Sequence, residues 1–183
     1  MPESPLIAAH RRLLAQWRGA MNLVGPGPLD PHYADADVGL ALLDPDPPAG
    51  RWADLGTGAG FPGIPFAARF PSARVELVDS RQKRCVFLEH VLREAGADGV
   101  TVRCARIETL PPGAYDGVVS RALAPPAEVL GHAARLLRPG GRAVLWLGDA
   151  EVPLPPGFQL IARHRYASDP PRQVLVLRWV PPG

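Results

Sequence analysis

The sequence predicts an α/β fold built on a mostly parallel sheet. After Gly50, short apolar runs alternate with longer stretches in which apolar side chains recur at helical spacing. Strands separated by helices in this way pair in parallel through right-handed crossovers. The expected strands lie at about 51–55, 74–78, 100–103, 115–119 and 141–147, and the expected helices at about 61–70, 81–96 and 126–137.

The two ends of the chain do not follow this alternation. Ser4–Arg18 and Tyr33–Leu43 have the apolar spacing of short helices, and proline-containing segments follow each of them. Phe158–Arg165 and Arg172–Trp179 are strand-like runs on either side of a turn that contains two prolines. We therefore expect a short N-terminal helical extension and a C-terminal antiparallel strand pair.

Length and composition narrow the class of protein. A chain of 183 residues has room for one domain, which we expect to divide into a helical extension at 1–48 and a core at 49–183. The sequence has no run of about 18 apolar residues and no secretory pattern at its start. Cys85 and Cys104 lack metal-ligand spacing, and the five histidines are scattered. We expect a cytoplasmic monomer with no membrane contact and no metal site.

The most informative segment is the glycine turn after the first strand of the core. It reads Asp54-Leu-Gly-Thr-Gly-Ala-Gly-Phe-Pro-Gly63, in which the first three glycines fit G-x-G-x-G. Glycines here permit a tight turn and close approach of a ligand to the backbone. Asp79 ends the next strand, 23 residues after Gly56, where a carboxylate can accept both hydroxyl protons of a ribose. The pattern indicates a nucleoside-containing ligand at the carboxyl ends of the strands.

Two cofactor classes use such a turn. Dinucleotide sites prefer G-x-G-x-x-G and need a free helix N-terminus for the pyrophosphate. Here position 61 is Phe61, and Pro62 and Pro65 stiffen the start of the helix. S-adenosylmethionine (SAM) has no phosphate, and Asp54 suits the neighbourhood of its cationic sulfonium. We therefore expect a class I SAM-dependent methyltransferase with a Rossmann-like sheet, with a glycine turn that binds no ligand as the alternative.

The segment from Asp54 to Pro65 closely resembles the RsmG (GidB) family of bacterial 16S rRNA methyltransferases. The G-F-P-G-I-P extension of the turn is far more specific than the G-x-G-x-G turn itself. Trp17 and Asn22-Leu23 resemble a worn version of a W…NLT segment of the family. The resemblance continues at Leu77-Val-Asp-Ser-Arg-Gln-Lys-Arg84, Ala105-Arg-Ile-Glu108 and Tyr115-Asp-Gly-Val-Val-Ser-Arg-Ala122.

The resemblance implies a reaction, a partner and a set of site residues. The family transfers methyl from SAM to N7 of a guanine in the 530 loop of 16S rRNA, so the implied partner is the small ribosomal subunit. By motif match, Asp79 would hold the ribose, Ile107 and Glu108 would flank the adenine, and Arg121 would reach the cofactor or substrate side of the cleft. The cofactor-binding candidates are Asp54, Gly56, Gly58, Phe61, Asp79, Ile107, Glu108 and Arg121, and Arg121 is also the catalytic candidate.

Several of these residues have a plainer interpretation. Phe61 could belong to the core, Glu108 could cap a helix, and Arg121 could form a surface ion pair.

Guanine N7 carries a lone pair and no proton, so alignment with the methyl group needs no general base. Trp146 is the aromatic we consider for stacking on the base.

A basic cluster opens the helix expected at 81–96. Arg81, Lys83 and Arg84 stand at the mouth of the predicted cleft, and we expect them to contact RNA phosphates. The alternative is an ordinary solvated helix face. Three arginines of the first helix could extend the surface: Arg11, Arg12 and Arg18.

The sequence also departs from the family pattern. Leu147-Gly148 stands where the family typically has Lys-Gly, which puts one RNA contact in doubt. Three rival interpretations remain: a methyltransferase that acts on a small molecule, a non-catalytic SAM- or RNA-binding relative, and a NAD oxidoreductase.

Overall fold

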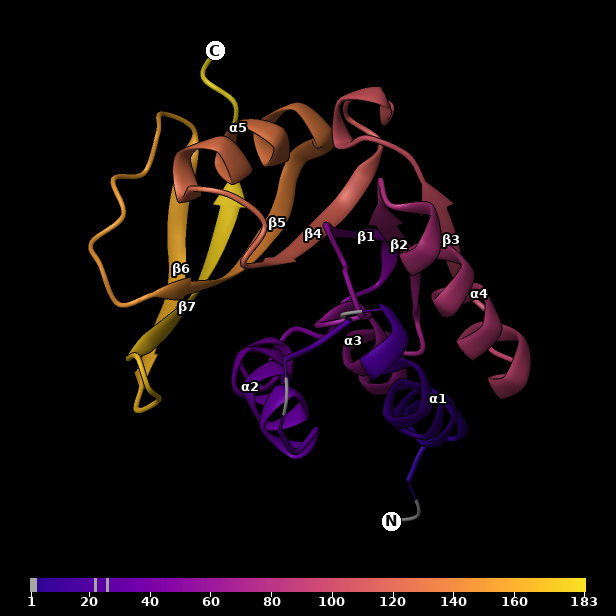
Figure 1. Ribbon diagram of the computed structural model, residues 1–183. Coiled ribbons are helices and arrows are strands. Elements are labelled where there is room, and N and C mark those ends of the chain that lie inside the picture. The colour runs from indigo at the N-terminus through magenta and orange to yellow at the C-terminus, as the bar shows by residue number, and fades with distance from the viewer. Residues whose placement is uncertain (1–2, 22, 26) are drawn as a thin grey trace.

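The computed structural model describes residues 3–21, 23–25 and 27–183 (Figure 1). Asn22 of the W…NLT-like segment and the first two residues lie outside the described residues. The helical elements are α1 (Pro5–Met21), α2 (Asp30–Leu40), η1 (Ala41–Leu43), α3 (Gly63–Arg69), α4 (Gln82–Ala95), η2 (Ile107–Thr109) and α5 (Pro126–Leu136). The strands are β1 (Gly50–Leu55), β2 (Ala73–Asp79), β3 (Val100–Cys104), β4 (Tyr115–Arg121), β5 (Leu137–Gly148), β6 (Phe158–Tyr166) and β7 (Arg172–Trp179).

The strands form one seven-stranded sheet in the order β3-β2-β1-β4-β5-β7-β6. The first five pair in parallel, and β7 pairs antiparallel with both β5 and β6. The predicted α/β fold with a C-terminal antiparallel pair is thereby confirmed. The chain order reverses direction at β1, between β2 and β4, which is where open α/β sheets bind their ligands.

Helices cover both faces of the sheet (Figure 1). Side chains of α1 to α4 pack with Trp52 and Leu77 in one core, whereas α5 packs with Leu55 and Val118 in the other. Alternate residues of β1 therefore point into different cores, which is the period-two pattern of a strand buried on both faces.

The extension packs against the core and reaches the carboxyl ends of the strands. At Gly39, α2 lies so close to the indole of Trp146 that a side chain there would overlap the ring. The indole N–H of Trp146 donates to the carbonyl oxygen of Asp35 at 2.8 Å. Because Trp146 is 1% exposed, it cannot stack on a substrate base, and that expectation is wrong.

Several expected boundaries also differ, two of them beside the site or within the sheet. The helix expected at 61–70 begins at Gly63, because residues 57–62 form a turn closed by bonds from the Gly60 and Phe61 N–H groups to the Thr57 carbonyl. The strand expected at 141–147 begins at Leu137, and its Pro-Gly-Gly segment forms an irregularity between its two parallel pairings with β4. Within the described ranges, none of the helices has the length and apolarity that crossing a bilayer requires.

Candidate active site

A cavity of about 520 Å³ opens at the carboxyl ends of β1, β2 and β4. Its walls come from the glycine turn, the end of β2, η2 and the first turns of α5. Six of the predicted site residues line this cavity: Gly56, Asp79, Arg81, Arg84, Ile107 and Glu108. The structure therefore brings together four of the eight predicted cofactor-binding residues, and it adds two arginines that were predicted to contact RNA.

The glycine turn adopts a backbone that other residues rarely reach. Gly56, Gly58 and Gly60 have φ values of 69°, 60° and 101°. The N–H of Thr57 donates to the Val78 carbonyl at 2.9 Å, which ties the turn to the end of β2. The turn thus presents its backbone to the cavity at Gly56.

Asp79 is the most constrained side chain of the cavity, with 5% of its surface exposed. One carboxylate oxygen accepts hydrogen bonds from the Gly58 N–H at 3.0 Å and from Arg84 Nη1 at 3.1 Å. The other oxygen accepts the Arg81 N–H at 2.9 Å. A carboxylate offers about four acceptor positions, so two ribose hydroxyls require one of these donors to withdraw. Arg84 is the only side chain among the three donors.

On the η2 side of the cavity, a histidine lies close to two carboxylates. Nε2 of His132 lies 3.9 Å from one carboxylate oxygen of Glu108 and 3.9 Å from one of Glu128. Glu108 is the acidic residue in the first turn of η2, a position that its helix-cap interpretation also expects. Its side chain is 64% exposed and borders the cavity together with Ile107.

Asp54 does not face the cavity. It is fully buried beneath the turn, where it accepts the N–H of Gly63 at 2.8 Å. A side chain at position 63 would overlap Asp54 and Leu77, which explains the glycine. The place of Asp54 among the cofactor-binding candidates is corrected, because Asp54 does not line the cavity and its carboxylate anchors the first turn of α3. Burial raises its pKa to about 6, against the opposing hydrogen bond from Gly63.

The Asp54→Asn variant should gain stability relative to the wild type as the pH rises. A carboxyl group whose pKa is raised on folding contributes its full stability at low pH and loses it as the pH rises through about 6. Asparagine keeps an acceptor for Gly63 and carries no charge. Urea unfolding at pH 4.0 and pH 7.5 gives the unfolding free energy of the variant minus that of the wild type. Between these pH values the difference should change by about 1–2 kcal/mol in favour of the variant. A difference that does not change with pH would contradict this assignment.

Phe61, which belongs to the turn, and Arg121, at the end of β4, do not line the cavity. Phe61 is 3% exposed and packs in the core, as its plainer interpretation holds. The Arg121 guanidinium lies 4.9 Å from the centre of the Phe61 ring and donates to Asp35 at 2.9 Å. Both side chains of the Arg121–Asp35 pair are only 12–13% exposed, so the ion pair is more shielded than a surface pair.

Asp35 is a functional candidate that sequence reasoning missed. Besides Arg121, its carboxylate accepts the hydroxyl of Tyr166 at 2.5 Å and pairs with Arg172 at 3.0 Å. Arg121 is 86 positions and Tyr166 131 positions away along the chain, and Arg172 lies farther still, so no local motif connects them. A second cavity of about 700 Å³ lies between α2 and the β6–β7 turn and is bordered by Asp35, Tyr166 and Arg172.

The predicted phosphate contacts separate into free and engaged side chains. Arg81 and Lys83 have exposed side chains without an ion pair, whereas the Arg84 guanidinium is engaged by Asp79. Arg11 and Arg12 are held by carboxylates of other elements, and the side chain of Arg18 lies outside the described residues. Only Arg81 and Lys83 therefore keep the geometry of a free basic surface.

Comparison with known sequences decides the family. Residues 4–152 match the family described as rRNA small subunit methyltransferase G. The chain belongs to this family. A protein of that name from Paracoccus denitrificans (strain Pd 1222) is 34% identical over 94% of this chain and 93% of its own length. Another from Bradyrhizobium sp. (strain ORS 278) is 38% identical over 76% of this chain and 67% of its own.

Solved structures agree on the fold. A mutant of MtNAS in complex with S-adenosylmethionine aligns with a TM-score of 0.68 at 16% identity, over 97% of this chain and 72% of that one. TrmN from Thermus thermophilus aligns with a TM-score of 0.61 at 21% identity, over 86% of this chain and 55% of that one. The seven-stranded sheet is that of a class I methyltransferase, as expected for an rRNA small subunit methyltransferase G.

Proposed function

We propose that this chain transfers a methyl group from SAM to N7 of a guanine in 16S rRNA, in the 530 loop of the small ribosomal subunit. The observation that carries the proposal is Asp79, which stands at the end of β2 beside the glycine turn and borders a cavity of about 520 Å³. Membership of the rRNA small subunit methyltransferase G family supports the rRNA substrate. Residues 1–183 would act as one domain and as a cytoplasmic monomer.

The residues of the cavity fit SAM. Asp79 offers acceptors to the ribose once Arg84 withdraws, and the backbone at Gly56 is open to the ligand. Ile107 and Glu108 supply an apolar and a polar group at the other end, which suits an adenine ring with its amino group. Bound SAM would supply a methyl group on a positively charged sulfur, which is a good leaving group.

The chain's own part in the reaction is alignment. Guanine N7 already presents a lone pair, so no side chain has to remove a proton before attack. Arg121, held by Asp35 and Phe61 at the end of β4, would border the substrate side of the cleft. Arg172 lies opposite Gly148 in the β5–β7 register, next to the position where the family lysine is replaced by Leu147.

Neutralising Arg81 and Lys83 together should weaken binding to 16S rRNA and flatten its salt dependence. Each lost phosphate contact reduces the slope of log K against log salt concentration by about 1. Filter binding between 50 and 300 mM KCl would measure the slope for the R81Q/K83Q double variant. The control is Arg93→Gln, at the opposite end of α4. An unchanged slope in the double variant would remove these residues from the RNA surface.

Methyl transfer from labelled SAM tests the proposed function directly. The acceptors are purified 30S subunits that lack the modification, protein-free 16S rRNA and a set of small nucleophiles, including free guanosine. The expected result is incorporation into the ribosomal substrate alone, recovered as 7-methylguanosine. Incorporation into small acceptors alone would favour a small-molecule methyltransferase, and SAM binding without any transfer would favour a non-catalytic relative.

A further inference from the structure

We propose that His10 and Tyr33, both from the N-terminal extension, are positioning residues for the glycine turn. His10 lies on α1 and Tyr33 on α2, and the two side chains form a hydrogen-bonded chain that ends on the backbone of the turn. The proposal rests on the proposed function, because SAM is the ligand whose binding the turn would serve.

The hydrogen bonds of His10 fix its protonation state. His10 is fully buried, with Nε2 2.7 Å from the Ala59 carbonyl oxygen and Nδ1 2.8 Å from the Tyr33 hydroxyl. A carbonyl oxygen only accepts, so Nε2 carries the proton. Nδ1 then accepts the hydroxyl proton of Tyr33, and a single neutral tautomer satisfies both partners. Burial, with a smaller contribution from Arg11, lowers the pKa of His10 to about 4, so the ring stays neutral near pH 7.

The bond to Ala59 reaches the turn where it has least support of its own. Ala59 stands between Gly58 and Gly60, which have positive φ values and, because glycine lacks a Cβ, can also adopt many other backbone conformations. The neighbouring N–H of Gly58 donates to Asp79, the proposed ribose carboxylate. A displacement at Ala59 is therefore passed to the Gly58–Asp79 bond within one residue.

Tyr33 strengthens this arrangement. Its ring meets Phe61 edge-on, with 4.9 Å between centroids, and the guanidinium of Arg11 lies 4.3 Å from its ring centre. The Tyr33 hydroxyl is thus held in place while it fixes the His10 tautomer. The extension therefore contacts the turn at two residues: His10 bonds to Ala59, and Tyr33 packs on Phe61.

The competing interpretation is that His10 is a core residue only. Its ring centroid lies 5.0 Å from that of Phe61 and 6.1 Å from that of Phe87, which a packing role explains equally well. Packing alone predicts that replacement lowers stability without a specific effect on SAM. Positioning predicts that SAM affinity falls in the variants that lose the hydrogen bond to Ala59, whether or not their stability falls.

Four variants of the full chain separate these interpretations. His10→Leu removes both hydrogen bonds, His10→Gln keeps a donor for Ala59, and Tyr33→Phe removes only the hydroxyl. Leu14→Ala is the matched control, because Leu14 is fully buried on the same helix and makes no side-chain hydrogen bond. Calorimetry gives the Kd for SAM, methyl transfer to 30S subunits gives KM and kcat, and thermal unfolding gives Tm.

His10→Leu should raise the Kd and the KM for SAM about 10-fold, since it leaves a buried carbonyl unpaired, while kcat changes less than about 2-fold. Tyr33→Phe should raise the Kd about 3-fold, and His10→Gln should recover most of the affinity. Leu14→Ala should lower Tm and leave the Kd within about 2-fold of the wild type. The positioning role would be overturned if His10→Leu bound SAM with the wild-type Kd. It would also be overturned if Leu14→Ala, which only lowers Tm, weakened SAM binding as much as His10→Leu does.

Amide hydrogen exchange keeps the outcome independent of the cofactor. In the unliganded protein, His10→Leu should speed exchange at the Gly58, Gly60 and Phe61 amides about 10-fold, whereas β2 exchanges as in the wild type. Unchanged exchange at these three amides would refute the proposal even if the Kd rose. If the wild type binds no SAM, the proposed function fails, and the exchange rates still decide whether His10 holds the turn.

Discussion

The Asp79→Asn variant is expected to bind SAM about 100-fold more weakly than the wild type. Asparagine replaces one acceptor oxygen with an NH₂ group, which would face the N–H of either Gly58 or Arg81. The variant therefore loses a charged acceptor for the ribose and sets two donors against each other. Loss of a hydrogen bond to a charged group together with such a mismatch costs about 3 kcal/mol, which corresponds to about 100-fold in affinity.

Isothermal titration with SAM and with its demethylated product measures this effect. Asp98→Asn is the control, because Asp98 is an exposed carboxylate in the loop before β3 that forms no ion pair. The control should bind like the wild type. If Asp79→Asn retained an affinity within about 3-fold of the wild type, the ribose would not be held at the end of β2.

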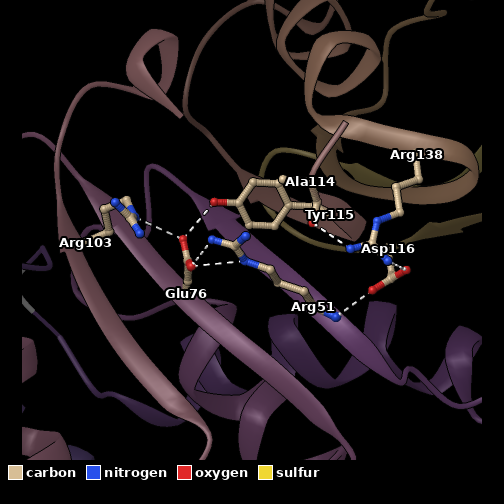
Figure 2. A network of polar contacts seen from close by, with 7 residues as sticks. All are labelled: Arg51, Glu76, Arg103, Ala114, Tyr115, Asp116 and Arg138. Carbon is tan, nitrogen blue, oxygen red and sulfur yellow. Dashed lines mark hydrogen bonds and ion pairs between the residues drawn. The ribbon is translucent and has the colours of Figure 1, made fainter. Parts of the chain in front are cut away.

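The Glu76→Gln variant should lose about 2 kcal/mol of unfolding free energy. Figure 2 shows Glu76 at the centre of a network with Arg51, Arg103 and Tyr115. These residues belong to β1, β2, β3 and β4. Its two oxygens accept Arg51 at 2.5 and 3.1 Å, Arg103 at 3.1 Å and the Tyr115 hydroxyl at 2.7 Å. Glutamine keeps the shape but leaves the two guanidinium groups without their carboxylate. Because these groups are 35% and 46% exposed, water compensates part of the loss, which keeps the expected cost below that of a buried pair.

Urea unfolding at pH 7 measures the loss, and Glu89→Gln is the control. Glu89 is exposed on α4 and should change the unfolding free energy by less than about 0.5 kcal/mol. Burial alone would raise the pKa of Glu76, but the hydrogen bonds from Tyr115, Arg51 and Arg103 outweigh it and lower the pKa. The wild-type advantage is therefore present above the ordinary pKa of glutamate and is lost as the pH falls through the lowered value. An advantage that persists unchanged into strong acid would contradict the role of the ionised carboxylate.

The sequence predicted the sheet and the cavity because their signals are local. The alternation of strands and helices can be predicted from the period of the hydrophobic residues. The glycine spacing predicts a turn with positive φ values, which Gly56, Gly58 and Gly60 adopt. The position of Asp79 at the end of the neighbouring strand could be predicted from its distance along the chain from the glycine turn. For the turn glycines and Asp79, the spacing along the sequence is enough to predict the position in the fold.

The errors concern side chains whose direction depends on distant partners. Asp54 and Trp146 are polar or amphipathic residues near the cleft, yet both side chains are buried: one oxygen of Asp54 accepts the Gly63 N–H, and the Trp146 N–H donates to the Asp35 carbonyl. The contact to Trp146 comes from the N-terminal extension, whereas the contact to Asp54 comes from the first turn of α3. Asp35 acquires its role only when β4 and the terminal strand pair converge on α2, which no pattern within α2 announces.

The most direct measurement maps 7-methylguanosine in 16S rRNA from the source cells with and without this protein. The proposed function predicts a single modified guanine in the 530 loop that disappears in the deletion strain. The mark should return when the wild-type chain is expressed and should not return with Asp79→Asn at equal protein level. Persistence of the methyl group in the deletion strain would contradict the assignment of this chain as the guanine-N7 methyltransferase.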